Sequence, residues 1–259
     1  MERPGGLSAI GNTPVVRLAR MAGDGCAEVW VKMEAANPTG SYTDRMARAM
    51  IAAAEADGRL QPGQLVVEYT GGSTGSSLAF VCAVKGYPLR IVSSDAFADE
   101  KIRTMRAFGA EVELIPSPDG ITPGLIPSMM RRAAEIAAQT GAFATDQFNN
   151  TDMIDGYRKL GEELLDQLPG PPPLSAFCSY VGSPASSTPD GDAPVMDLVG
   201  LIRGTVTRWR VMRGTPSRGT LAVSASARSR APGRWCARGR SPWPRAALPS
   251  QMKGGKHDG

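Results

Sequence analysis

The sequence of 259 residues is poor in the side chains that bind metals or build disulfide frameworks. It has a single histidine, His257, close to the last residue. Four cysteines are scattered along it without a CxxC pair: Cys26, Cys82, Cys178 and Cys236. Neither a zinc site nor a disulfide framework is expected from this pattern. The simplest interpretation is a reduced, cytoplasmic chain without a metal.

Long hydrophobic runs are also missing. The first residues, MERPGGLSAIGNTPVVRL, contain no apolar segment of the kind found in signal peptides, and no run approaches the ~20 apolar residues that span a bilayer. Secretion and membrane insertion are therefore not expected. Hydrophobic residues still make up 42% of the chain, which is enough to build the core of one large domain or two modest ones.

The net charge of +4 hides two different halves. From Ser183 onward the chain has eleven Arg and two Lys against four Asp and no Glu, a charge of +9, which leaves −5 for residues 1–182. The segment 183–259 is rich in Arg, Pro, Ser and Gly and has no sustained helical or strand periodicity, so it is expected to be a disordered basic tail. An out-of-frame translation of the gene would explain the abrupt change in composition.

Before the tail, strand-like runs alternate with helix-like ones. The expected strands are residues 27–34, 64–70, 89–94, 111–116, 143–150 and 174–182, and the expected helices are residues 41–58, 77–86, 99–110, 128–141 and 152–168. In the first helix, Met46, Met50, Ile51 and Ala54 form an apolar stripe, and Gly58 suits the position after its end. Short strands separated by helices predict an α/β fold with a parallel sheet.

Two Gly-rich loops in this series each lead into a helix. They are NPTGSYTDR (37–45) and EYTGGSTGSS (68–77). In a parallel sheet such turns gather at the edge where strands end, and their N–H and hydroxyl groups can hold a carboxylate or phosphate. Either loop alone could be an ordinary capped turn. The presence of two favours a site for a small anion.

Five segments of the chain resemble one enzyme family. They are GNTPVVRL (11–18), VKMEAANPTGSYTDR (31–45), EYTGGSTGSSLA (68–79), DQFNN (146–150) and YRKLGEEL (157–164). They are similar, in the same order, to segments of the pyridoxal-phosphate (PLP)-dependent β-replacement enzymes of the cysteine synthase (O-acetylserine sulfhydrylase) and cystathionine β-synthase type. The resemblance implies the tryptophan synthase β-subunit-like, fold type II class of PLP enzymes.

The resemblance also assigns residues to roles. Thr43 stands where the family has the lysine that forms a Schiff base with PLP. The family's substrate-carboxylate loop matches Thr70, Gly71, Gly72, Ser73 and Thr74, and Gln147 matches a further contact to that carboxylate. The position of Ser73 also approaches the cofactor ring. The loop that holds the PLP phosphate matches VGSPASSTPDG, with Gly182, Ser183, Ser186 and Ser187 as the candidate contacts.

Two departures from the family pattern concern the cofactor. A threonine cannot replace the lysine as covalent anchor or as base, and Pro184 removes an N–H donor from the phosphate loop. Of the six lysines, Lys32 is the one that could substitute as anchor, although a structural role for it is favoured. Retention of PLP by this chain is therefore in doubt.

The resemblance implies a domain arrangement as well. Residues 37–146 correspond to a small βα domain that carries the substrate loop. Residues 13–36 and 147–182 correspond to part of a larger PLP domain, which is expected to be incomplete because the resemblance ends where the basic tail 183–259 begins. Relatives are homodimers through the larger domain, so a homodimer is possible here.

Three functions follow as hypotheses. The first is a cysteine synthase-like enzyme of L-cysteine biosynthesis, making cysteine from O-acetylserine or a similar activated serine, with activity impaired by Thr43. The second is a pseudoenzyme that binds an amino-acid carboxylate or a protein partner. The third, which is less favoured, is nucleic-acid binding by the tail, where Trp209, Trp235 and Trp243 lie among arginines.

Overall fold

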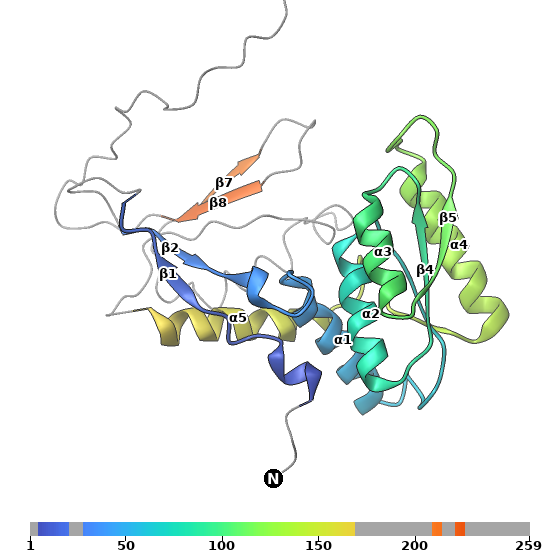
Figure 1. Ribbon diagram of the computed structural model, residues 1–259, viewed down its shortest axis with the longest axis horizontal. Coiled ribbons are helices and arrows are strands. Elements are labelled where there is room, and N and C mark those ends of the chain that lie inside the picture. The colour runs from blue at the N-terminus through green and yellow to red at the C-terminus, as the bar shows by residue number, and fades with distance from the viewer. Residues whose placement is uncertain (1–4, 21–27, 169–208, 214–220, 226–259) are drawn as a thin grey trace, which may run out of the picture.

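A four-stranded parallel sheet, packed between helices, forms one side of the molecule in the view of Figure 1. The computed structural model describes residues 5–20, 28–168, 209–213 and 221–225. The sheet has the strand order β5-β4-β3-β6, and every neighbouring pair in it is parallel. Its strands are β3 (Val66–Tyr69), β4 (Leu89–Ser94), β5 (Glu111–Ile115) and β6 (Phe143–Ala144). Each of them lies in a segment that the sequence predicts as a strand, so the expected α/β class with a parallel sheet is confirmed.

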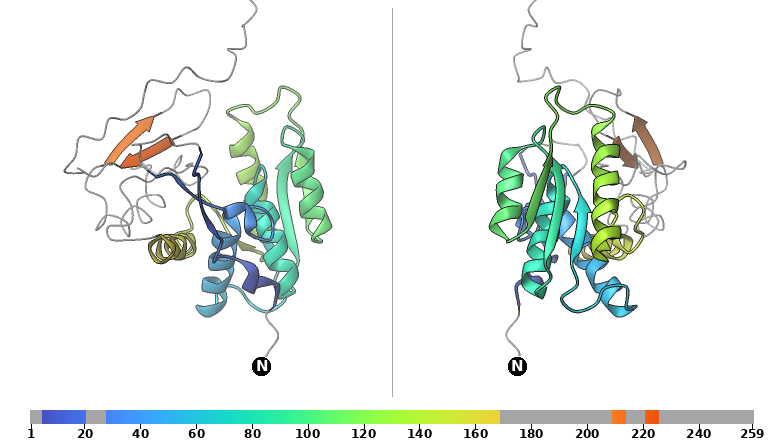
Figure 2. Two further views of the ribbon diagram at one scale, coloured as in Figure 1. Left: turned by 60° about the vertical axis from the view of Figure 1, so that its left-hand side comes forward. Right: turned by 90° about the vertical axis from the view of Figure 1, so that its right-hand side faces the viewer.

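Helices cover both faces of this sheet. The helices are α1 (Thr43–Ala56), α2 (Ser73–Lys85), α3 (Asp99–Ala107), α4 (Leu125–Thr140) and α5 (Met153–Gln167), of which α5 packs on α1 and not on the sheet. Figure 2 shows α3 and α4 on opposite faces. Successive side chains of a strand point to opposite faces, so Val66 of β3 packs in the core cluster with α1 and α2, whereas Val67 and Tyr69 pack in the cluster with α4.

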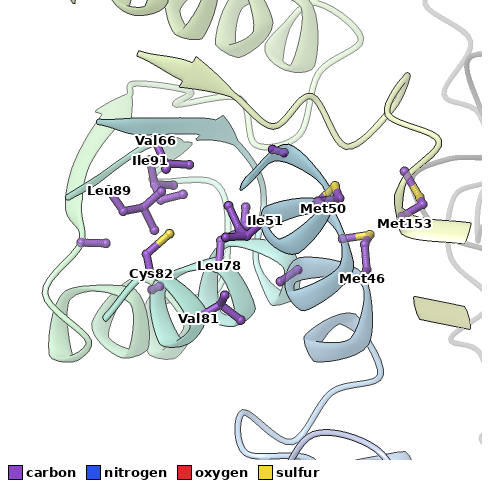
Figure 3. Close-up of a cluster of buried hydrophobic side chains, with 14 of the residues drawn as sticks. Met46, Met50, Ile51, Val66, Leu78, Val81, Cys82, Leu89, Ile91 and Met153 are labelled. Atoms are coloured by element: carbon purple, nitrogen blue, oxygen red, sulfur yellow. The ribbon is translucent and has the colours of Figure 1, made fainter. Parts of the chain in front are cut away.

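The larger cluster joins α1 and α2 to the sheet (Figure 3). The apolar stripe expected on the first helix is buried in full, and Gly58 follows its end with a φ of 79°. Leu78 and Cys82 of α2 meet Ile91 of β4 in the same cluster. Full burial of an aliphatic side chain of this size stabilises the fold by about 1.5–3 kcal/mol, so this cluster sets how α1 and α2 sit on the sheet.

Two helices begin earlier than the sequence pattern predicts. Helix α2 starts at Ser73 rather than at residue 77, because Gly72 can act as its N-terminal cap. Helix α4 starts at Leu125 rather than at residue 128, with Pro127 in its first turn. Proline is tolerated there because the N–H groups of a first turn have no intrahelical acceptor. As a consequence, Ser73 and Thr74 belong to a helix and not to a loop.

The remaining elements lie outside the parallel sheet. Strand β1 (Val15–Arg17) pairs antiparallel with β2 (Trp30–Lys32), and β7 (Trp209–Arg213) pairs antiparallel with β8 (Leu221–Ala225). Two short 3-10 helices, η1 (Gly6–Ala9) and η2 (Glu34–Ala36), complete the set. The expected strand 174–182 and most of the tail 183–259 lie outside the described residues.

Helix α5 lies directly against α1. A Cβ atom added at Gly156 of α5 would be 2.5 Å from the backbone oxygen of Arg45 in α1. Contacts that short do not occur between a real Cβ and a backbone oxygen, so glycine is required for the two helices to approach this closely. This packing brings the side chains of α5 next to the beginning of α1.

Within the described ranges, no helix is both long enough and apolar enough to cross a membrane. The same ranges contain no group of three or more His, Cys, Asp or Glu side chains that could hold a metal ion.

The close approach of α5 to α1 predicts that Gly156→Ala destabilises the protein. The added methyl group must push α5 away from α1, and such overpacking costs about 1–3 kcal/mol. We expect a lower midpoint in urea unfolding followed by circular dichroism. The matched control is Gly124→Ala at the start of α4, where a Cβ meets nothing within 4 Å. Equal midpoints for the two variants would contradict the requirement for glycine at position 156.

Candidate functional site

The predicted substrate loop lies where β3 ends and α2 begins. Thr70 follows β3, and its N–H donates to the Val92 carbonyl at 3.0 Å. Its hydroxyl accepts from the Gly72 N–H at 3.1 Å. Gly72 caps α2 without a side-chain hydrogen bond, and the first N–H groups of a helix have no intrahelical acceptors. The N–H groups of Ser73 and Thr74 thus lie at a helix end that favours an anion.

Two glycines of this segment lie in close packing, where an added Cβ would force its neighbours to shift. A Cβ at Gly71 would lie 2.6 Å from the Phe97 ring, and a Cβ at Gly75 would lie 2.6 Å from the Thr70 methyl group. The loop therefore runs tightly between the β4–α3 connection and its own helix. Gly75 was not among the predicted site residues, although a third glycine within five residues was a visible signal.

The structure brings Thr74 and Gln147 together across 73 positions of sequence. The Thr74 hydroxyl donates to the Gln147 side-chain oxygen at 2.7 Å. The Gln147 amide nitrogen donates to the Tyr69 carbonyl at 2.7 Å. An amide nitrogen carries two hydrogens, so Gln147 keeps one donor beyond this bond. The two predicted substrate contacts are thus neighbours, and their role in binding stays a prediction.

A buried carboxyl group, Glu68, lies behind this pair, and the sequence reasoning missed it. Glu68 is 1% exposed and accepts hydrogen bonds from the Thr145 hydroxyl and from the N–H groups of Tyr69 and Gln147. Burial raises the pKa of Glu68 from 4.5 to about 7, although these hydrogen bonds act to lower it. The only signal in the sequence was a charged residue inside the apolar run LVVEY.

Thr43 begins α1 and is 7% exposed. Its hydroxyl lies 2.7 Å from the Ser41 hydroxyl and 2.7 Å from the Ser77 hydroxyl of α2. Ser77 also lies 2.6 Å from the Asp44 carboxylate, and this oxygen can only accept. Asp44 is held in turn by the N–H of Thr39 at 2.8 Å and by its hydroxyl. Thr43 is therefore a member of a buried hydroxyl chain that connects α1 to α2.

The donor and acceptor of each hydrogen bond in this hydroxyl chain follow from counting protons. A hydroxyl has one proton to donate. Ser77 gives its proton to Asp44, so it must accept from Thr43, and Thr43 must accept from Ser41. The single proton of Thr43 is committed to Ser77. The Thr43 side chain is therefore a structural hydroxyl, and the resemblance predicts a lysine at this position.

Lys32, the alternative anchor for PLP, also has its ammonium group fully hydrogen-bonded. Its ammonium group donates to the Thr13 carbonyl at 2.6 Å, to Glu163 at 2.6 Å and to Gln167 at 2.8 Å, and its side chain is 8% exposed. An ammonium group has three hydrogens, and these three acceptors use all of them. The favoured structural interpretation of Lys32 agrees with this geometry.

The same carboxylate, Glu163, belongs to a buried charge cluster around Arg45. The guanidinium group of Arg45 is fully buried and binds both oxygens of Glu163, at 2.7 and 2.8 Å, and both oxygens of Glu34, at 2.8 and 2.9 Å. Burial alone would raise the pKa of Glu163, but hydrogen bonds from Arg45 and Lys32 outweigh it and lower that pKa to about 2. In this cluster the positive charges of Lys32 and Arg45 are balanced by the negative charges of Glu34 and Glu163.

Neither Thr43 nor Lys32 fits the role of covalent anchor for PLP. Thr43 offers no amine, and the ammonium group of Lys32 is enclosed by its three acceptors. Ser73 lies in the first turn of α2, where its hydroxyl could still meet the cofactor ring. The predicted phosphate contacts Gly182, Ser183, Ser186 and Ser187 lie outside the described residues.

Known proteins share this sequence and fold. The sequence profile of the family described as pyridoxal-phosphate dependent enzymes matches residues 7–186. Cysteine synthase of Staphylococcus aureus (strain Mu50) is 38% identical over 175 residues, which are 67% of this chain and 54% of that protein. Cysteine synthase B of Escherichia coli (strain K12) is 38% identical over 180 residues, 69% of this chain and 57% of that protein.

A solved structure agrees with these relatives. A lysine-to-alanine variant of O-ureido-L-serine synthase, with O-ureido-L-serine bound, superimposes with a TM-score of 0.67 at 32% identity. The match covers 79% of this chain and 59% of that one. The matched part of the chain thus spans little more than half the length of each of these proteins. The expected fold type II class and the resemblance to cysteine synthases are confirmed.

The lowered pKa of Glu163 predicts acid sensitivity. The pKa of Glu163 is lower in the folded protein than its unfolded value of about 4.5. Ionised Glu163 therefore contributes its full stabilisation above about pH 4.5. This stabilisation is lost as the pH falls from about 4.5 through about 2. Glu163→Gln should therefore lower the free energy of unfolding most at pH 7, and the gap to wild type should narrow towards pH 2.

The measurement is urea unfolding at a series of pH values. Glu111→Gln serves as the control, because the side chain of Glu111 is 65% exposed and its loss should change stability little. A gap between wild type and Glu163→Gln that stays constant with pH would show that the charge cluster is not the source of the stabilisation.

Proposed function

Because this chain belongs to the family of pyridoxal-phosphate-dependent enzymes, we propose that it is a cysteine synthase-like protein that binds an amino acid by its carboxylate and has lost most or all β-replacement activity. The observation that carries this proposal is the hydroxyl chain Ser41–Thr43–Ser77. It places a fully bonded hydroxyl where the family resemblance expects the reactive amine.

The geometry of the substrate loop supports amino-acid binding. The first-turn N–H groups of α2 and the second amide hydrogen of Gln147 are donors of the kind that a carboxylate accepts. Thr74 and Tyr69 orient the Gln147 amide through its oxygen and its other hydrogen. A ligand carboxylate in this place would take its hydrogen bonds from the backbone and from one preset side chain.

The loss of activity follows from the chemistry of the anchor. PLP serves as an electron sink at the amino-acid Cα in the enzymes that bind it. That use requires an amine as covalent anchor and as base, and a threonine hydroxyl provides neither near neutral pH. No described residue of this chain takes over these roles in our proposal.

A related protein supports the separation of binding from chemistry. The O-ureido-L-serine synthase variant holds O-ureido-L-serine although one of its lysines has been replaced by alanine. We extend this to the present chain, in which the proposed ligand is a small amino acid such as serine or an activated serine. Because its relatives include cysteine synthases, we place its origin in L-cysteine biosynthesis.

The proposed carboxylate site predicts which side chains determine affinity. Thr74→Val and Gln147→Leu should each weaken L-serine binding by about tenfold or more, because each change removes or misorients a hydrogen bond to a charged group. The measurement is an NMR titration of the labelled protein. Gln64→Leu is the control, because Gln64 lies outside the site, where its amide donates to the Gly141 carbonyl. Unchanged affinity in both site variants would contradict the location of the site.

The proposed loss of chemistry predicts no covalent cofactor. After incubation with PLP and reduction with borohydride, peptide mapping should find no modified Lys32, and the protein should form no cysteine from O-acetyl-L-serine and sulfide. Thr43→Lys should not restore cysteine formation, because Pro184 still removes a donor from the predicted phosphate loop. Circular dichroism checks that this variant is folded. Full activity of Thr43→Lys would refute this view of the loop, and cysteine formation by the wild-type protein would refute the proposal.

A further inference from the structure

Glu68 is a buried ionisable group for which the proposed binding site has no direct use. It lies on β3 between Val67 and Tyr69, and all four residues of this strand are buried. A carboxyl group in such a place costs free energy unless it is hydrogen-bonded. Glu68 has three donors around it, so its position is built into the fold.

Two of the three donors, on Thr145 and Gln147, belong to the segment that follows β6, and the third is on β3 itself. One carboxyl oxygen of Glu68 accepts from the Thr145 hydroxyl at 2.7 Å and from the Gln147 N–H at 3.0 Å. The other accepts from the Tyr69 N–H at 2.8 Å. Strands β3 and β6 pair through only Val66–Phe143 and Val67–Ala144. Beyond these two pairs, Glu68 continues the connection with its side chain.

The carboxyl group is thus one hydrogen bond away from the proposed ligand contact. The backbone of Gln147 is held by Glu68, and its side chain is held by Thr74 and by the Tyr69 carbonyl. A shift of the backbone at residue 147 would move the amide relative to the N-terminus of α2. The Glu68 bond therefore contributes to the geometry of the pair Thr74–Gln147.

We propose that Glu68 is a positioning residue, which in its ionised form holds Gln147 in the geometry that binds an amino-acid carboxylate. This inference rests on the proposed function for the identity of the ligand. It adds that affinity for the ligand depends on the charge of a group that does not touch it.

The physical reason is the difference between charged and neutral acceptors. Hydrogen bonds to an ionised carboxylate are roughly twice as strong as those to a neutral group. Burial raises the pKa of Glu68 to about 7, so its charge changes near neutral pH. Among the described residues, the titratable groups that interact with it are Asp146, whose negative charge raises this pKa further, and Tyr69. Protonation below pH 7 should loosen the turn around Gln147.

The first experiment needs no ligand. Carbon-13 NMR of the side-chain carboxyl groups, with Glu68→Gln for assignment, should show Glu68 titrating near pH 7. The backbone amide signal of Gln147 should shift with the same midpoint. Asp146→Asn should move both midpoints to lower pH. A Glu68 that does not titrate between pH 5 and 9, or a Gln147 signal that does not follow it, would overturn the proposal.

The second experiment measures the affinity for L-serine, which has no group that titrates near pH 7. In wild type and in the control Glu113→Gln, the affinity should fall on the order of tenfold between pH 8 and pH 6. In Glu68→Gln it should be weak and independent of pH. A wild-type protein that binds L-serine equally at both pH values would overturn the role of Glu68 and leave the proposed function intact.

The two failures can be told apart. A wild-type protein that does not bind L-serine at any pH would count against the proposed function. The coupling of Glu68 to Gln147 would then be decided by the ligand-free titration alone. If Glu68→Gln does not fold, the affinity of the wild-type protein for L-serine at pH 8 and pH 6 still decides the proposal, because that measurement requires no variant.

Discussion

The packing of α1 against α5 and against the first segment of the chain depends on the buried guanidinium group of Arg45. It is shared between Glu34, near the beginning of the chain, and Glu163, on helix α5. Removing one partner of such a cluster leaves uncompensated buried charge, which is far more costly than the cluster itself is stabilising. Because Arg45 lies in the first turn of α1, the cluster also determines where that turn lies, and with it Thr43 and Asp44. The charge cluster thus stabilises the beginning of α1, next to the proposed site.

Two hydrogen-bond systems hold the connection between β3 and α2 in place. On one side the hydroxyl chain through Thr43 connects α1 to Ser77 of α2. On the other side Glu68 and Gln147 connect β3 to the segment after β6. The substrate loop at the beginning of α2 lies between them. This arrangement favours rigidity of the proposed binding site, because its polar groups already have hydrogen-bond partners in the ligand-free structure.

Much of the fold could be predicted from periodicity. The strands of the parallel sheet and the apolar stripe of α1 lie where the pattern places them, because burial on a sheet or a helix face imposes a regular spacing. The start of α2 was predicted four residues late, since Gly72 reads equally well as a turn or as a cap. Thr70 to Thr74 and Gln147 were assigned as substrate contacts by resemblance to a family, and that assignment stays a prediction. Glu68 was missed because one charged residue in a strand does not reveal which donors surround it.

The sequence by itself determined the family of this chain and the absence of an amine at position 43. The second follows from covalent structure alone, since a threonine has no nitrogen in its side chain whatever the fold around it. Only the tertiary structure decided that the Thr43 proton is committed to Ser77, that Lys32 has no free donor, and that Glu68 supports Gln147. Those partners lie 34, 131 and 79 positions apart in the sequence. Hydrogen bonds depend on distances of about 3 Å, and such distances between remote segments are set only when the whole core packs.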